Sequence, residues 1–144
     1  MDVDGNFPNH PADPSDENNL LDLKDKVISQ NLDFGVAFDG DADRSVFIDD
    51  KGNLISGSLM TCLISDWLFE KKSEIKVVHN VNVQPSVVKY LNDKGIKTIR
   101  SKVGHSYIKK IMRDKDADFG GEHSAHFYLR ENFYADSGIL TLLI

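Results

Sequence analysis

The residues best suited to chemistry form the stretch Asp39-Gly40-Asp41-Ala42-Asp43-Arg44, which directly follows the apolar run 34–38. Three carboxylates this close together repel one another, so each resists ionisation unless a counter-charge is present. Mg²⁺ or Ca²⁺ prefers oxygen ligands and would neutralise the cluster. We therefore predict that Asp39, Asp41 and Asp43 bind a divalent metal ion. The cationic Arg44 that follows indicates that an anionic ligand, such as a phosphate, binds beside the metal ion.

Two other interpretations of this stretch compete with a metal site. An EF-hand also begins with alternating acids, but its loop requires Gly at the sixth position and Glu at the twelfth. Those positions hold Arg44 and Asp50 here, so the EF-hand is excluded. A solvated acidic turn without a ligand stays open as an alternative, although the preceding apolar run and the terminal arginine favour a site.

A second cluster is the segment 120–126, Gly-Gly-Glu-His-Ser-Ala-His. Glu122, Ser124 and His126 alternate, so an extended loop would direct all three side chains the same way. Together they offer the donors and acceptors that vicinal sugar hydroxyls require. Zinc binding by Glu122, His123 and His126 is an alternative, but the order differs from the His-Glu-x-x-His pattern of zincins. An ordinary polar loop is the other alternative.

A third segment, 102–106, reads Lys-Val-Gly-His-Ser. A glycine at a helix start leaves free backbone N–H groups, which are a ready anion site. Lys102 and His105 could add positive charge there. A histidine at a helix start is more often a cap or a surface residue, so the segment is informative only beside the other two.

Composition narrows the class of protein. The 144 residues carry a net charge of −6 with a pI near 5.2, which argues against nucleic-acid binding as the main role. Cys62, the single cysteine, lies in an apolar helical pattern and is predicted to be a core residue. The sequence shows no signal peptide and no apolar stretch long enough to span a membrane, so we expect a cytoplasmic protein.

The positions of apolar and turn residues predict an α/β fold with mixed sheets flanked by helices. The expected elements are a helix over 20–28 capped by Asn18, a strand 34–38, a hairpin of 45–48 and 53–55 turning at Gly52, a helix 58–72, a strand 75–79, a helix from Pro85 closed by Gly95, a strand 96–100, a helix from Gly104, strands 118–120 and 126–129, and a last helix through 144 capped by Asp136 or Ser137. In the helix 58–72 we expect one buried stripe, made of Leu59, Met60, Leu63, Ile64, Trp67 and Leu68.

Taken together, the three segments closely resemble the α-D-phosphohexomutase superfamily of phosphomannomutases and phosphoglucomutases. The metal loop of that family reads Asp-Gly-Asp-(Gly or Ala)-Asp-Arg, as residues 39–44 do. Its sugar-binding loop reads Gly-Glu-x-Ser-Gly-His, which residues 121–126 match except for Ala125 at the second glycine. Residues 104–106 match its Gly-His-Ser segment, and residues 4–10 look like part of its second domain.

The resemblance implies a reaction and a set of roles. Members transfer a phosphoryl group between the 1- and 6-positions of a hexose phosphate, here of mannose or glucose, through a bisphosphorylated intermediate. It implies that Asp39, Asp41 and Asp43 hold Mg²⁺ and that Arg44 lies beside the reacting phosphoryl group. The implied substrate-binding residues are Glu122, Ser124 and His126, and His105 is an implied catalytic residue.

The sequence departs from the family in ways that suggest a fragment. Its phosphoserine loop and the phosphate-binding loop of its fourth domain are absent, and Asn82 stands near the place of a lysine that some members carry. We expect residues 1–48 to be the C-terminal part of domain 2, and residues 49–144 to be most of domain 3, truncated at its end. The expected partners are then domains 1 and 4 of a parent enzyme, and the fragment alone should be inactive.

Two other functions are weighed against this one. A haloacid-dehalogenase-like phosphatase uses Asp-x-Asp around Mg²⁺, and Asp39-x-Asp41 fits, but such enzymes expect Thr or Val where this chain has Asp43. A non-enzymatic metal-binding module would bind a divalent ion without a sugar phosphate.

Overall fold

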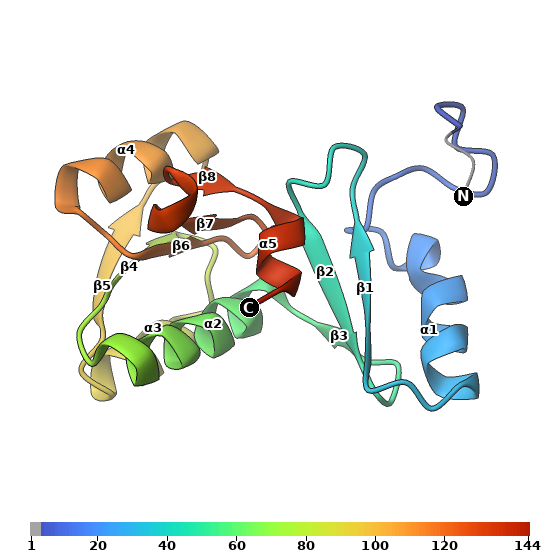
Figure 1. The fold of residues 1–144 in the computed structure, drawn as a ribbon, viewed down its shortest axis with the longest axis horizontal. Helices are drawn as coiled ribbons and strands as arrows, with labels where there is room; N and C mark the ends of the chain where they lie inside the picture. Colours follow the sequence, from blue (N-terminus) through green and yellow to red (C-terminus); the bar gives the residue numbers. More distant parts are fainter. Residues whose placement is uncertain (1–3) are drawn as a thin grey trace.

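The computed structural model describes residues 4–144, which form two neighbouring sheets (Figure 1). The first three residues of the expected domain 1–48 lie outside the described residues. The expected α/β architecture with mixed sheets is confirmed. Among the described residues, no helix is long and apolar enough to cross a membrane.

The first sheet is an antiparallel meander of β1 (Phe34–Phe38), β2 (Ser45–Asp49) and β3 (Leu54–Ile55). Phe38 pairs with Ser45, so residues 39–44 form the loop that joins the first two strands at their shared end. The expected hairpin between β2 and β3 is present, and Gly52 turns it with φ +81°. That left-handed conformation favours glycine.

One short 3-10 helix, η1 (Glu17–Leu20), leads into α1 (Leu21–Ser29), which packs beside β1. The predicted cap at Asn18 is wrong. Asp16 caps the segment instead, and its carboxylate accepts a hydrogen bond from the Asn18 backbone N–H at 3.0 Å. The helical segment begins at Glu17, so Asn18 lies inside it, and the free N–H groups at its start are within reach of the Asp16 carboxylate.

The second sheet has the strand order β5-β4-β6-β7-β8. Its strands are β4 (Lys76–Asn80), β5 (Lys97–Ser101), β6 (Phe119–Gly121), β7 (Phe127–Leu129) and β8 (Ala135–Asp136). β4, β5 and β6 are parallel, as expected of strands joined by helices, whereas β7 and β8 run antiparallel and are linked through η2 (Arg130–Asn132). The two-residue β8 was not expected from the sequence.

Helices cover both faces of this sheet (Figure 1). α2 (Gly57–Lys72) and α3 (Pro85–Asp93) pack on one face, and α4 (His105–Lys115) packs on the other. The larger apolar cluster extends from Val46 and Ile48 of the first sheet to Val77 and Phe119 of the second. A continuous core therefore joins the two sheets, and the loops at their junction are held between them.

The predicted buried stripe of α2 is only partly right. Leu59 and Leu63 are 46% and 49% exposed, while the small polar side chains of the helix are buried. Those buried residues are Ser58, Thr61 and Ser65. The reason is the close approach of the helix to β6: a Cβ atom at Gly121 would collide with the Thr61 side chain. Large residues cannot fit between elements this close.

A short α5 (Gly138–Leu142) follows β8 and lies at the junction of the two sheets (Figure 1). Ser137 caps it, as one of the two expected caps, by accepting a hydrogen bond from the Leu140 N–H at 3.2 Å. The helix ends at Leu142 and so is shorter than the expected helix through 144.

Candidate metal and anion site

The acidic loop, residues 39–44, is held in place by backbone contacts from two other segments. Gly138 N–H at the start of α5 donates to the Ala42 carbonyl at 2.9 Å. Ser45 N–H donates to the Ala125 carbonyl at 3.2 Å, and Arg44 forms an isolated β-bridge with His126. The loop is thus fastened to the hairpin turn, residues 122–126, which joins β6 to β7.

Two glycines permit this close packing. A Cβ atom at Gly138 would lie 2.7 Å from the Arg44 carbonyl oxygen, and one at Gly57 would lie 2.5 Å from the His123 carbonyl oxygen. Each glycine opens a helix directly after a capping serine. The repeated Ser-Gly pair is the only local signal in the sequence for these contacts, and no prediction was drawn from it.

The structure brings the three predicted metal ligands together. Asp39, Asp41 and Asp43 each offer a carboxylate oxygen, and these oxygens lie within 4.8 Å of one another. Oxygen donors at this spacing, one of them on an exposed side chain, fit a hard divalent cation that keeps some of its water. The donor set therefore agrees with Mg²⁺.

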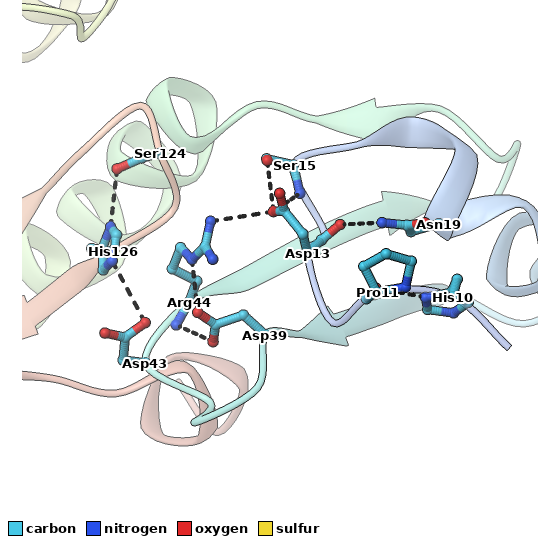
Figure 2. A network of polar contacts seen from close by, with 10 residues as sticks. All are labelled: His10, Pro11, Asp13, Ser15, Asn19, Asp39, Asp43, Arg44, Ser124 and His126. Atoms are coloured by element: carbon cyan, nitrogen blue, oxygen red, sulfur yellow. Dashed lines mark hydrogen bonds and ion pairs between the residues drawn. The ribbon is translucent and has the colours of Figure 1, made fainter. Parts of the chain in front are cut away.

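Arg44 is paired most closely with Asp39 (Figure 2). Its Nε donates to Asp39 Oδ2 at 2.7 Å, and its backbone N–H donates to Asp39 Oδ1 at 3.1 Å. Burial alone would raise the pKa of Asp39, but these hydrogen bonds outweigh it and hold the pKa below its usual value. Asp39 is therefore ionised at neutral pH, as a metal ligand must be.

Asp43 behaves in the opposite way. Burial and the neighbouring Asp39 raise the pKa of Asp43, and His126 partly counteracts this effect. The His126 Nε2 lies 3.5 Å from Asp43 Oδ1 (Figure 2). The cluster thus carries more negative charge than the neighbouring cationic groups neutralise. A bound cation would reduce the resulting repulsion between the carboxylates.

Glu122 corrects the prediction for the hairpin turn. Residues 122–126 are not extended but turn tightly, with Ala125 N–H donating to the Glu122 carbonyl and Ala125 at φ +67°. Glu122 therefore points inward and is buried. Its Oε1 accepts from Asn80 Nδ2 at 2.7 Å, and its Oε2 accepts from the Tyr128 hydroxyl at 2.6 Å. Three side chains directed the same way, as an extended loop would give, are not observed.

Ser124 and His126 do lie on the side of the acidic loop. Ser124 Oγ and His126 Nδ1 share a hydrogen bond of 3.0 Å, so the imidazole lies between Ser124 and Asp43 (Figure 2). A cavity of about 220 Å³ adjoins the turn, lined by Ser124, His123 and the Pro14-Ser15 segment among others. There is space for a small ligand beside these side chains.

The zinc alternative lacks support from the geometry. Across residues 4–144, the clustered potential ligands are the three aspartates of the acidic loop and the set Asp43, His126 and Asp136. His123 instead shares a hydrogen bond of 2.9 Å with Ser58. In the second set, Asp136 already has a counter-charge, because the Lys109 ammonium lies 2.7 Å from it.

His105 is the predicted site residue that the structure does not connect to the others. It is the first residue of α4, where it is exposed. Within the described chain, no hydrogen bond or ion pair joins its side chain to the acidic loop or to the hairpin turn.

Three residues of the polar network were not predicted from the sequence. Asn80 and Tyr128 hold Glu122, and Asp13 Oδ1 lies 3.4 Å from the Arg44 guanidinium. Burial and the Glu122 carboxylate raise the pKa of Tyr128, so its hydroxyl keeps the proton that it donates. Of these three residues, only Asn80 could have been found from the sequence, because it is the last residue of a strand, and ligands bind beyond the carboxyl ends of such strands.

Comparisons of the sequence with known proteins point to one enzyme family. The family model "Phosphoglucomutase/phosphomannomutase, alpha/beta/alpha domain III" matches residues 56–144, and the model of domain II matches residues 1–52. A phosphomannomutase of Methanocaldococcus jannaschii is 38% identical over 139 residues, which cover 96% of this chain and 31% of that protein. A phosphomannomutase of Escherichia coli K12 is also 38% identical, with 98% and 31% covered.

A crystal structure shows the same arrangement in three dimensions. A phosphoglucomutase/phosphomannomutase family protein from Burkholderia thailandensis aligns with a TM-score of 0.91 and 30% identity over 97% of this chain and 31% of that one. The chain therefore spans about a third of the length of the relatives that it matches.

The alternative of a haloacid-dehalogenase-like phosphatase is disfavoured by the comparisons, because the matched family models are those of phosphoglucomutase/phosphomannomutase domains II and III.

Proposed function

The chain belongs to the phosphoglucomutase/phosphomannomutase family, and we propose that it supplies the metal-binding and substrate-binding loops of a hexose-phosphate mutase. The proposed reaction is the reversible conversion of hexose 1-phosphate into hexose 6-phosphate, an isomerisation by phosphoryl transfer. Mannose or glucose phosphates are the proposed substrates, and Mg²⁺ is the proposed cofactor. Similarity to proteins named phosphomannomutase supports the substrate class.

The single observation that carries the proposal is the junction of the two loops. The bridge between Arg44 and His126 sets a carboxylate cluster, a guanidinium group and a turn with an exposed hydroxyl and a partly buried imidazole side by side. Phosphoryl transfer depends mainly on positioning and on stabilising charge, which are the two things that this arrangement offers.

Each side chain then has a proposed role. Asp39, Asp41 and Asp43 would hold Mg²⁺, which supplies positive charge beside a transferring phosphoryl group. Arg44 binds phosphate oxygens through N–H groups that Asp39 leaves free. Ser124 and His126 bind sugar hydroxyls.

For the two remaining predicted residues the roles are less direct. Glu122 reaches the substrate only through the lone pairs that Asn80 and Tyr128 do not use. His105 stays a proposed proton-transfer residue.

The phosphoryl donor is proposed to come from other parts of the enzyme. The family's phosphoserine motif is absent from the 144 residues, and the relatives are about three times as long. We propose that residues 1–48 belong to domain 2 and residues 49–144 to domain 3, that domains 1 and 4 complete the site, and that this chain alone has no mutase activity. A cytoplasmic location stays a prediction.

Calorimetric titration of Mg²⁺ into the chain tests the metal site. We expect binding that Asp41→Ala abolishes, because Asp41 is an exposed ligand whose loss leaves the fold intact. Asp50→Ala is the matched control, since it removes the same charge from an exposed turn at the other end of β2 and should leave binding unchanged. Equal loss in both variants would mean that only general negative charge attracts the ion, and would reject the site.

Titration of mannose 1-phosphate in the presence of Mg²⁺ tests the substrate class. We expect weak binding that Ser124→Ala weakens further, observed as chemical-shift changes at the turn. Metal binding without any effect of the sugar phosphate would favour the metal-binding module instead.

A further inference from the structure

The Arg44 guanidinium contacts carboxylates from two distant parts of the chain (Figure 2). Asp39, five residues away, accepts from Nε at 2.7 Å. Asp13, from the segment before η1, accepts from one terminal nitrogen at 3.4 Å. In the part of the chain that the structure describes, the remaining guanidinium N–H groups have no hydrogen-bond partner, and the Arg44 side chain is 26% exposed.

The two contacts differ in strength. The Asp39 side chain is 6% exposed and its contact is short, so this pair is a lasting part of the loop. The Asp13 side chain is 49% exposed and its contact lies at the limit of hydrogen bonding. Ion pairs of the second kind contribute little to stability and exchange easily with solvent or with another anion.

Asp13 does not depend on Arg44 for its position. Its Oδ1 accepts from the Ser15 N–H at 3.1 Å and from the Ser15 hydroxyl at 2.7 Å, while its carbonyl accepts from Asn19 Nδ2 at 2.8 Å. Hydrogen bonds from Ser15 are the main cause that lowers the pKa of Asp13, and Arg44 contributes less. The carboxylate is therefore ionised and fixed in front of Arg44 whether or not the arginine pairs with it.

We propose that Asp13 is a positioning residue that acts as an exchangeable counter-ion of Arg44, which the phosphate group of a bound ligand displaces. Because Asp39 occupies Nε, an incoming phosphate must use the two terminal nitrogens, which is the side that Asp13 faces. Without a ligand, Asp13 occupies that side of the guanidinium and lowers its affinity for anions. This inference rests on the proposed function, in which Arg44 binds phosphate.

The test uses inorganic phosphate as the probe, titrated into the Mg²⁺-containing 144-residue chain. Asp13→Asn removes the charge but keeps an oxygen that accepts from Ser15. Removing one negative charge this close to the bound anion should tighten phosphate binding by about three- to tenfold. The gain should shrink as salt is added, because the charges are exposed.

Asp16→Asn is the matched control. Asp16 makes the same kind of hydrogen bonds to a residue two positions on, at Asn18, and has no contact with Arg44. It should leave phosphate affinity unchanged. Asp13→Ala separates charge from amide donation, since it should also bind phosphate more tightly than the unaltered chain, although the segment loses its bonds to Ser15.

The NMR signal of the Arg44 Nε–H group reports on the guanidinium directly, and tighter binding of phosphate is the result that a purely structural role of Asp13 would not give. We expect it to shift in Asp13→Asn without ligand, and phosphate to shift it in the unaltered chain. Weaker or unchanged phosphate binding in Asp13→Asn would overturn the inference.

The inference and the proposed function fail in different ways. If Arg44→Gln abolishes phosphate binding while Asp13→Asn has no effect, the inference is overturned and the role of Arg44 stands. If no variant binds phosphate, both the inference and the assignment of Arg44 to phosphate are overturned. Loss of Mg²⁺ binding in Asp41→Ala would still support the metal site by itself.

Discussion

Gly57 is the position at which one methyl group should disturb the hairpin turn most directly. In Gly57→Ala, the new Cβ atom would lie 2.5 Å from the His123 carbonyl oxygen, 2.6 Å from the Glu122 carbonyl oxygen and 2.9 Å from the Ala125 nitrogen. All three are backbone atoms, which cannot rotate away as the end of a side chain can. Relief therefore requires the turn to move by roughly 1 Å away from α2.

The magnitude follows from two opposing effects. Alanine is favoured over glycine in a helix interior by about 1 kcal/mol, which is an upper limit for the first residue of α2. Overpacking a filled interior costs about 1–3 kcal/mol, and more where backbone must shift. Because three backbone atoms are involved, we expect the collision to exceed the gain, and the free energy of unfolding to fall by about 1–3 kcal/mol. For a chain of this size that corresponds to a melting temperature lower by about 3–10 °C.

Thermal unfolding and backbone NMR spectra together check this prediction. Gly5→Ala serves as a control, because a Cβ atom there would meet nothing within 4 Å. In Gly57→Ala the largest chemical-shift changes should lie in residues 122–126, and mannose 1-phosphate should bind more weakly. A melting temperature equal to or above that of the unaltered chain would show that helix propensity dominates and would refute the reasoning.

Three further predictions concern other positions. Ala42 has the left-handed φ of +59°, so Ala42→Gly should raise the free energy of unfolding, measured by urea denaturation, by about 0.5–1 kcal/mol. Ala12 does not have a positive φ, so the control Ala12→Gly should lower the free energy of unfolding. Burial alone would raise the pKa of Asp118, but hydrogen bonds and cationic neighbours lower it from its ordinary 3.8, so its contribution to stability is present above that pH and is lost as the pH falls through the lowered value. Asp118→Asn should lower the free energy of unfolding by about 2–4 kcal/mol at neutral pH and flatten the acid limb of the curve of stability against pH. An unchanged acid limb would contradict this prediction. Burial raises the pKa of the Cys62 thiol, so iodoacetamide should modify it only in urea, and modification at an equal rate without urea would contradict its place in the core.

Local features of the sequence predicted much of the fold. The hairpin that turns at Gly52, the helix that begins at Pro85 and the alternation of parallel strands with helices depend on residues close together in the chain. In these elements the short-range preferences agree with the global fold. The face that α2 buries was predicted only in part, because it depends on which strand lies beneath the helix and on how closely the two pack.

The acidic loop shows what the sequence determined by itself. Asp39, Asp41 and Asp43 lie within five residues of one another after a strand, and Arg44 reaches Asp39 from five positions away. Convergence of these groups needs only a tight turn, so the pattern predicted the cluster without knowledge of the rest of the chain.

Tertiary structure alone decided how the other groups meet this loop. Asp13 comes to Arg44 from 31 residues away, and Asn80 comes to Glu122 from 42 residues away. Those contacts exist because the core joins the two sheets and because Gly57 and Gly138 let helix starts approach the loops. No short-range pattern encodes such distances, and for that reason Glu122 was expected to point the same way as Ser124 and His126 but is buried.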